Sequence, residues 1–148
     1  MAEENLLDAF WAVARALRGR SRSMLQPWGI SPWQSRALGE LGRHGPMRLG
    51  VLSERLRIAA RSTTEVVDGL EALGLVAREP DPGDRRATVV SLTPEGEQRR
   101  RDIRAAQLAE ADEYFSVLTP EERESLALSL RKLRPERGGG NGDAPPSG

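Results

Sequence analysis

The chain has 148 residues, of which 38% are apolar and 30% charged, a balance that suits a single globular domain with its own core. Cysteine is absent and His44 is the only histidine, which excludes disulfides, thiolate chemistry and cysteine- or histidine-rich metal sites, and we expect no metal and no cofactor. No apolar run is long enough to span a membrane, and the acidic start lacks the pattern of a signal peptide, so we predict a cytoplasmic protein with no membrane partner.

The net charge of zero argues by itself against a nucleic-acid-binding protein, because such domains are often strongly basic. Of the 22 basic residues, however, only Lys132 is lysine. Arginine suits bidentate contact with phosphate and guanine better than lysine does. Codon bias in a GC-rich genome would produce the same ratio, so the positions of the arginines have to carry the interpretation.

Two helices are predicted at the start of the chain. Apolar residues at helical spacing indicate a first amphipathic helix over residues 3–24. Ser31, Pro32 and Gln34 have the pattern of a capping box with proline at the first helical position. They predict a second helix that ends near Gly42.

A short helix, a tight connection and a longer helix are predicted next. Leucines at regular spacing mark the short helix over residues 49–56, and Arg57-Ile58 forms the connection. The fourth helix then runs from about Ala60 to Leu73, with Gly74 in the usual place for a C-terminal cap. Its inward-facing residues are predicted to be Thr63, Val66, Val67, Leu70 and Leu73.

A β-hairpin is predicted after this helix. Residues 75–78 form its first strand, turn-forming residues occupy 81–84, and alternating residues over 87–92 form the returning strand. Two strands alone would be marginally stable, so the hairpin must lean on the helices.

Two more helices and a tail complete the chain. Thr93-Pro94 predicts the start of a fifth helix that reaches about residue 118. Thr119 with Glu122 forms another capping box, which starts a sixth helix. The Gly/Pro-rich residues 135–148 have no apolar anchor and predict a disordered tail.

The middle of the chain therefore has the order of a helix-turn-helix followed by a hairpin. In a helix-turn-helix the second helix lies in the major groove of DNA, with its N-terminal residues at the base edges. The candidate major-groove contacts are Arg61, Ser62, Thr64 and Glu65. An ordinary surface helix with a polar start is the alternative interpretation of the same residues.

A second set of candidates lies at the tip of the hairpin, where Asp84, Arg85 and Arg86 follow Pro82-Gly83. Two arginines on a protruding turn can enter a minor groove, where negative potential concentrates. A solubilising charged turn is the alternative.

The hairpin also carries a family resemblance. Residues 84–93 match the wing signature D-x-R-x-x-x-V-x-L-T of the MarR family of bacterial transcriptional regulators. The matching residues are Asp84, Arg86, Val90, Leu92 and Thr93. The preceding segment from Leu49 and the two flanking helical regions extend the resemblance over about residues 5–134.

The resemblance implies a mainly α fold with a small β-hairpin, in a single domain over residues 1–134. The winged helix-turn-helix would span about 31–93, and dimerisation helices would span about 3–24 and 94–134. Arg86 resembles the arginine that enters the minor groove, Asp84 the acidic residue that holds this region, and Arg85 an added phosphate contact. The four candidates of the fourth helix fall where the family reads the major groove.

One departure concerns the start of this recognition helix. Ala59 and Ala60 stand where family members often have a capping serine and a proline. The missing cap costs about 1 kcal/mol. The residues that read bases are therefore less firmly defined than the helix itself.

The first, fifth and sixth helices carry more apolar surface than a winged domain needs. These residues are Leu6, Leu7, Phe10, Trp11, Leu17, Tyr114, Phe115, Leu118, Leu126, Leu130 and Leu133. They can form a core within one chain, or interlock with a second chain as in MarR-like proteins. We predict a homodimer, with recognition helices about 34 Å apart on a near-palindromic operator in double-stranded DNA.

A small-molecule effector is the other partner that the resemblance implies. MarR-like proteins often bind aromatic or amphipathic compounds between the dimerisation helices and the winged lobe. Trp11, Trp28 and Trp33 lie in the segments that would line such a crevice, and plain core packing is the alternative interpretation, the one that each tryptophan taken alone favours. We predict a repressor that such a ligand releases from its operator, because a dimer on a promoter blocks polymerase.

Two other classes of protein remain to be weighed. An enzyme would need a nucleophile with a base, a metal, or paired carboxylates in a pocket. The chain has no cysteine, and no Gly-rich phosphate loop follows a strand, so we predict no catalysis. A winged-helix module that binds another protein instead of DNA is the alternative function, but such a wing has no need of both Arg61 and Arg86.

Overall fold

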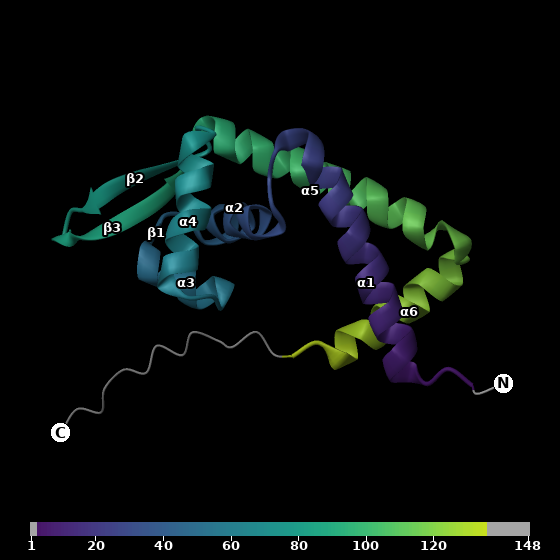
Figure 1. The fold of residues 1–148 in the computed structure, drawn as a ribbon. Coiled ribbons are helices and arrows are strands. Elements are labelled where there is room, and N and C mark those ends of the chain that lie inside the picture. Colours follow the sequence, from purple (N-terminus) through teal and green to yellow (C-terminus); the bar gives the residue numbers. More distant parts are fainter. Residues whose placement is uncertain (1–2, 136–148) are drawn as a thin grey trace, which may run out of the picture. The chain divides into compact units, whose positions relative to one another are not determined.

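The computed structural model describes residues 3–135 and divides into two compact units, Met1–Glu113 and Tyr114–Gly148 (Figure 1). The first unit contains α1 (Leu6–Leu25), the 3-10 helix η1 (Gln26–Trp28), α2 (Pro32–His44), β1 (Met47–Arg48), α3 (Leu49–Leu56), α4 (Ala60–Ala72), β2 (Val76–Asp81), β3 (Asp84–Leu92) and α5 (Pro94–Tyr114) except its last residue, which falls in the second unit. The second contains η2 (Phe115–Val117) and α6 (Pro120–Leu133). The predicted tail over residues 135–148 lies outside the described residues apart from Pro135, and the predicted single domain stays a prediction.

The helix starts follow the capping signals of the sequence. The Ser31 hydroxyl accepts the Gln34 N–H at 3.2 Å, and the Gln34 side chain accepts the Ser31 N–H at 2.9 Å. Thr119 and Glu122 make the same reciprocal pair at the start of α6. At α5 the Thr93 hydroxyl accepts an N–H of the first turn at 3.0 Å. These bonds satisfy N–H groups that a helix start otherwise leaves unpaired, and all three predicted starts are confirmed.

Two helices end at positions that differ from the predicted ones. α2 continues past Gly42 to His44 and ends at Gly45, whose φ is +77°. At Gly42 the Arg100 side chain passes so close that an added Cβ would lie 2.1 Å from it, and that side chain would have to move. At the other end of the unit α5 stops at Tyr114, and the next residues form η2, so the predicted continuous helix to residue 118 is broken there.

The sheet has three antiparallel strands in the order β1-β3-β2, not the two strands of the predicted hairpin. β1 is two residues long, and its Met47 lies opposite Val90. Both hairpin strands are also longer than predicted, so that only Pro82 and Gly83 form the turn. β2 runs through Pro80 because it is an edge strand, where a residue without an N–H is tolerated.

The core of the first unit is formed by α2, α3, α4 and the sheet, with contributions from α1 and α5. Its buried apolar residues are Leu25, Ile30, Ala37, Leu38, Leu41, Met47, Leu52, Leu56, Val67, Leu70, Leu75, Val76, Val90 and Ile103. Thr63 is also buried, as predicted, and its hydroxyl donates to the Ala59 carbonyl at 3.2 Å. Leu73 was predicted to face inward but is 47% exposed. It caps the end of α4, and Gly74, with φ +74°, turns the chain so that Leu75 enters the core instead.

The start of α5 packs closely against the chain that leaves α4. The Thr93 N–H donates to the Leu75 carbonyl oxygen at 3.1 Å. A Cβ at Gly96 would lie 1.9 Å from that same oxygen, so only glycine fits there. This contact joins the base of the hairpin to α5.

Candidate nucleic-acid interface

The turn between α3 and α4 is held by bonds across it. The Ser53 hydroxyl donates to the Ile58 carbonyl at 2.8 Å, and the Ile58 N–H donates to the Ser53 carbonyl at 3.4 Å. Arg57 between them has φ +56°, a left-handed conformation that a non-glycine residue adopts at a cost. The turn therefore fixes the direction in which α4 leaves α3, as the helix-turn-helix prediction requires.

Helix α4 presents the predicted major-groove residues. Arg61, Ser62 and Glu65 are exposed, and Thr64 is half-buried with its hydroxyl donating to the Ala60 carbonyl at 3.0 Å. Ala59 is the N-cap and makes no side-chain bond, so the predicted missing cap is confirmed. The first-turn N–H groups therefore have no capping side chain and stay open to an anion such as phosphate. The roles of the four side chains stay predictions.

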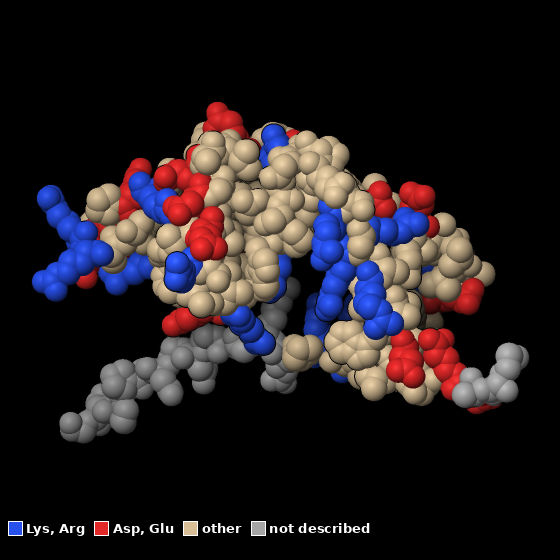
Figure 2. Space-filling model, viewed as in Figure 1, with Lys and Arg blue, Asp and Glu red and all other residues tan. Residues whose placement is uncertain are grey.

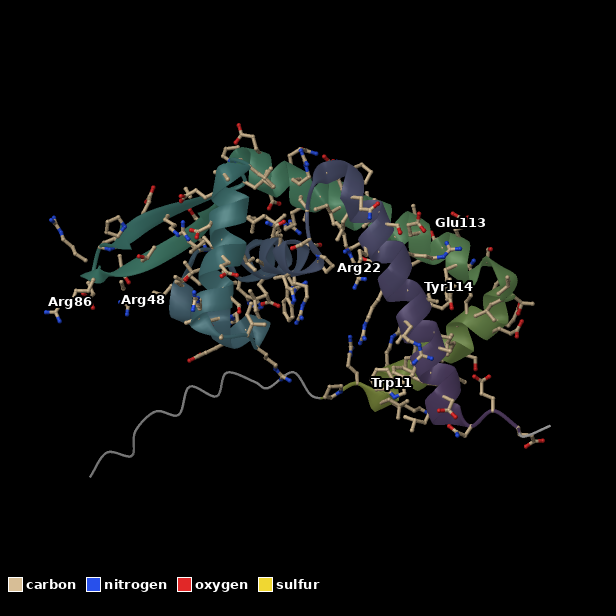
Figure 3. All side chains as sticks on the ribbon, viewed as in Figure 1. Trp11, Arg22, Arg48, Arg86, Glu113 and Tyr114 are labelled. Carbon is tan, nitrogen blue, oxygen red and sulfur yellow. The ribbon has the colours of Figure 1, made fainter. Side chains whose placement is uncertain are left out.

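The hairpin β2–β3 extends away from the helices of its lobe (Figure 1). Asp84, Arg85 and Arg86 open β3 and do not form part of the turn, which corrects their predicted place, yet all three are exposed at the end of the hairpin. Figure 2 shows basic side chains gathered over this end, and Figure 3 shows Arg86 pointing away from the body. Within residues 3–135 neither arginine has an ion pair.

Two aspartates shape this tip, which we call the wing (residues 81–86). Asp84 accepts the Arg86 N–H at 3.0 Å. Asp81 accepts the Gly83 N–H at 2.8 Å with one oxygen and Arg48 Nε at 2.6 Å with the other. The Gly83 N–H first, and then Arg48, lower the pKa of Asp81 because both stabilise its charged form.

Arg48 is one of two arginines at the interface that sequence reasoning missed. It lies 33 residues before Asp81, and β1 brings the two together by pairing with β3. Figure 3 shows Arg48 beneath the hairpin, on the same side of the lobe as Arg86. The two-residue β1 has no periodic pattern, so no sequence signal was available to find this pair.

The second missed residue is Arg78 on β2. Its guanidinium contacts the Asp68 carboxylate, Glu71 Oε1 at 3.3 Å and the Thr64 carbonyl at 3.3 Å, all on α4. A signal did exist, because acidic residues on the outer face of a helix were followed by a strand that carries an arginine.

The three tryptophans are not gathered in one cavity. Trp11 and Trp33 are 43% and 40% exposed, while Trp28 packs partly buried against the core. Each lies beneath a guanidinium, at 5.9 Å for Trp11, 4.6 Å for Trp33 and 5.8 Å for Trp28. A cavity of about 450 Å³ between α1 and α5 is lined by Arg15, Ala16, Gly19, Arg20, Ser23, Met24 and Glu110, and by none of the tryptophans. Their part in ligand binding stays a prediction.

Comparison with known proteins places this geometry in a family. Residues 28–87 match the sequence model described as the MarR family. The chain is 32% identical over 124 residues to the HTH-type transcriptional regulator YsmB of Bacillus subtilis (strain 168), covering 84% of this chain and 85% of that relative. It is 32% identical over 122 residues to the HTH-type transcriptional repressor MdtR of the same organism, covering 82% and 79%.

A solved structure agrees with the fold. Apo MarR from E. coli superposes with a TM-score of 0.83 over 91% of this chain and 100% of that one, at 23% identity. The predicted fold class is thereby confirmed. YsmB and MdtR are both named as transcriptional regulators, which confirms the prediction that the chain is not an enzyme. The signature of the wing, the winged helix-turn-helix lobe and the extended identity agree, and this chain belongs to the MarR family of winged helix-turn-helix transcriptional regulators.

Proposed function

We propose that this protein is a homodimeric, sequence-specific DNA-binding repressor of a near-palindromic operator. The observation that carries the proposal is the wing: two exposed arginines at the end of a hairpin, without an ion pair in the described chain. Other arginines of the lobe have carboxylate partners within the chain, as Arg48 and Arg78 do. Arg85 and Arg86 project from the tip without a carboxylate partner in the described part of the chain, so their guanidinium groups are available to phosphates and to a narrow minor groove.

Each candidate residue has a role in this proposal. Arg61 donates two hydrogen bonds to guanine, and Glu65 accepts one from cytosine. Ser62 and Thr64 contact bases or phosphates beside the open first-turn N–H groups. On the wing, Arg86 enters the minor groove and Arg85 contacts phosphate. Asp84 shapes this contact through its bond to the Arg86 N–H.

Dimerisation is supported by apolar surface that the described chain leaves open. On α1 the exposed fractions are 81% for Leu6, 63% for Leu7 and 49% for Phe10. A continuous apolar helix face of this kind marks a protein interface in a folded domain. Two copies related by a two-fold axis would set the recognition helices about 34 Å apart, one helical turn of DNA.

Repression and effector control complete the proposal. The relative MdtR is named a transcriptional repressor, which supports repression here. A small aromatic or amphipathic effector would act by preferring the conformation whose recognition helices are wrongly spaced for DNA. The protein must share a compartment with its operator DNA, so we also propose that it is cytoplasmic.

The test is operator binding by the Arg61→Ala/Arg86→Ala variant. DNA from upstream of the protein's own coding region serves as the probe, and fluorescence anisotropy measures affinity at several salt concentrations. We expect a loss of about 100-fold or more, since each base-contacting arginine contributes about 1–3 kcal/mol. Arg101→Ala is the control, because Arg101 is an exposed α5 arginine paired with Glu97. Unchanged affinity in the double variant would favour the protein-binding alternative.

A further inference from the structure

Arg78 connects strand β2 of the hairpin to the recognition helix α4 at three points. From β2 its guanidinium reaches the Asp68 carboxylate, Glu71 Oε1 and the Thr64 carbonyl oxygen. These acceptors span residues 64–71, about two turns of α4. The Arg78 side chain is 23% exposed, whereas its partners Asp68 and Glu71 are 59% and 46% exposed, so the contact lies at the surface with its guanidinium half-buried.

The chemistry of arginine makes this contact a geometric constraint. The guanidinium is planar, and its donors point in fixed directions. Three acceptors on one helix therefore define both the distance of α4 from β2 and its rotation about its own axis. Arg78 also lies opposite Val90 in the pairing of β2 with β3, so the same constraint extends to the strand that carries the wing arginines.

Charge provides a second consequence. Asp68 and Glu71 are exposed acidic residues on the helix proposed to enter the major groove. Without a cation beside them they would repel the phosphates on either side of the groove. Arg78 offsets one of these two negative charges from the protein side and leaves Arg61 and Ser62 open to the DNA.

We propose that Arg78 is a positioning residue for DNA recognition. It holds the recognition helix and the wing at the spacing at which both enter adjacent grooves, and it does not itself touch DNA. The inference rests on the proposed DNA-binding function, and it adds the residue that makes the two DNA-contacting elements act together. Loss of register at one bidentate base contact costs about 10- to 100-fold in discrimination.

The first experiment measures the helix-to-wing distance without DNA. The chain contains no cysteine, so spin labels can be placed on Ser62→Cys and Pro82→Cys alone, at two exposed positions. Labelled chain is diluted with excess unlabelled chain, and pulsed electron resonance gives the distance distribution. We expect one narrow peak with Arg78 present and a broader or shifted one in Arg78→Gln. Identical distributions in the two proteins would overturn the inference, whether or not the protein binds DNA.

The second experiment compares operator with random DNA in the unlabelled protein. We expect Arg78→Gln to reduce the ratio of the two affinities about 10- to 100-fold, with Arg78→Lys in between and the control Arg101→Gln unchanged. The salt dependence of operator binding should keep its slope, because no phosphate contact is removed. A slope that falls by about one would assign Arg78 to direct phosphate contact and overturn its positioning role.

The Asp68→Asn/Glu71→Gln variant distinguishes positioning of α4 by Arg78 from the effect of Arg78 on the negative charge of that helix. If Arg78 acts by position, removing its partners lowers operator affinity although it also removes two negative charges. If it acts only by neutralisation, the same variant binds all DNA more tightly, and the positioning role is refuted. A wild-type protein that prefers no operator over random DNA would instead refute the proposed function, and the distance measurement would still decide what Arg78 holds.

Discussion

The winged lobe and helix α1 use the same kind of apolar pattern with opposite results. In the lobe the central apolar residues of α2 and α4 are buried in the core: Leu38, Val67 and Leu70 are all 0% exposed. Along α1 only Leu25, at its end, is buried, whereas Leu6 and Phe10 remain exposed. The lobe therefore completes its core within one chain, and α1 does not.

Helix α6, considered by itself, resembles α1 in this respect. It has no buried residue, and its leucines stay open to solvent. Their exposed fractions are 39% for Leu126, 49% for Leu128, 40% for Leu130 and 72% for Leu133. An amphipathic pattern thus predicts that a face will be covered, but not by which chain. The difference between the two regions is what the homodimer proposal explains.

The largest expected effect is on dimerisation, when charged residues are introduced on the exposed apolar face of α1. This experiment tests whether that face is covered by a second chain. In Leu7→Glu/Phe10→Glu, dimerisation should weaken more than 100-fold, because each uncompensated charge buried at an interface costs about 3 kcal/mol or more. Sedimentation equilibrium measures the dissociation constant. Val51→Glu, at an exposed apolar position of α3, is the matched control and should stay dimeric. A wild-type protein that is monomeric at micromolar concentration would contradict the whole interpretation.

Gly96→Ala tests how tightly the lobe is packed. Its methyl group would lie 1.9 Å from the Leu75 carbonyl oxygen, which cannot move without disturbing the bond from Thr93. We expect a loss of about 1–3 kcal/mol in the free energy of unfolding, measured with urea. In the control Gly50→Ala, a helical position with nothing within 4 Å of the new Cβ, stability should hold or rise. Equal stability of the two variants would show that the base of the hairpin is loosely packed.

Ala59→Ser supplies the N-capping side chain that α4 lacks and tests a local contribution to the stability of the lobe. The backbone of Ala59 already has the extended conformation of an N-cap, with φ −61° and ψ 151°. A hydroxyl there should accept an N–H of the first turn and raise stability by about 1 kcal/mol. The same hydroxyl competes for N–H groups proposed to face phosphate, so we expect operator affinity to stay level or fall while the thermal midpoint rises. A lower midpoint would exclude the capping geometry.

The smallest effect concerns the pH dependence of stability that Asp81 of the wing contributes. Because the pKa of Asp81 is lowered in the folded protein, its contribution to stability is complete above the ordinary carboxyl pKa and is lost as pH falls through the lowered value. Asp81→Asn should therefore be less stable than wild type at neutral pH, and the two should converge in strong acid. Urea midpoints over a pH series measure the difference, and parallel curves at every pH would rule out the ionised bonds to Gly83 and Arg48.

Local signals in the sequence account for much of the fold. Ser31, Thr93 and Thr119 start their helices where predicted, since a cap depends on residues only a few positions away. The wing residues were identified for the same reason, because a turn and its charged neighbours are consecutive in the chain. Leu73 shows the limit: its spacing matched the helix face, but the turn at Gly74 placed Leu75 in the core instead.

What the sequence by itself determined is the order of the six α-helices and the hairpin, three helix caps, the exposure of the candidate residues on α4 and the wing, and the family. Only the tertiary structure decided that β1 joins the sheet, that Gly96 packs against the Leu75 carbonyl, that Arg48 pairs with Asp81, and that Arg78 contacts α4. The physical reason is the range of each interaction. Caps and turns are formed between neighbours in the chain, whereas ion pairs and close packing depend on which distant atoms folding brings within a few ångströms.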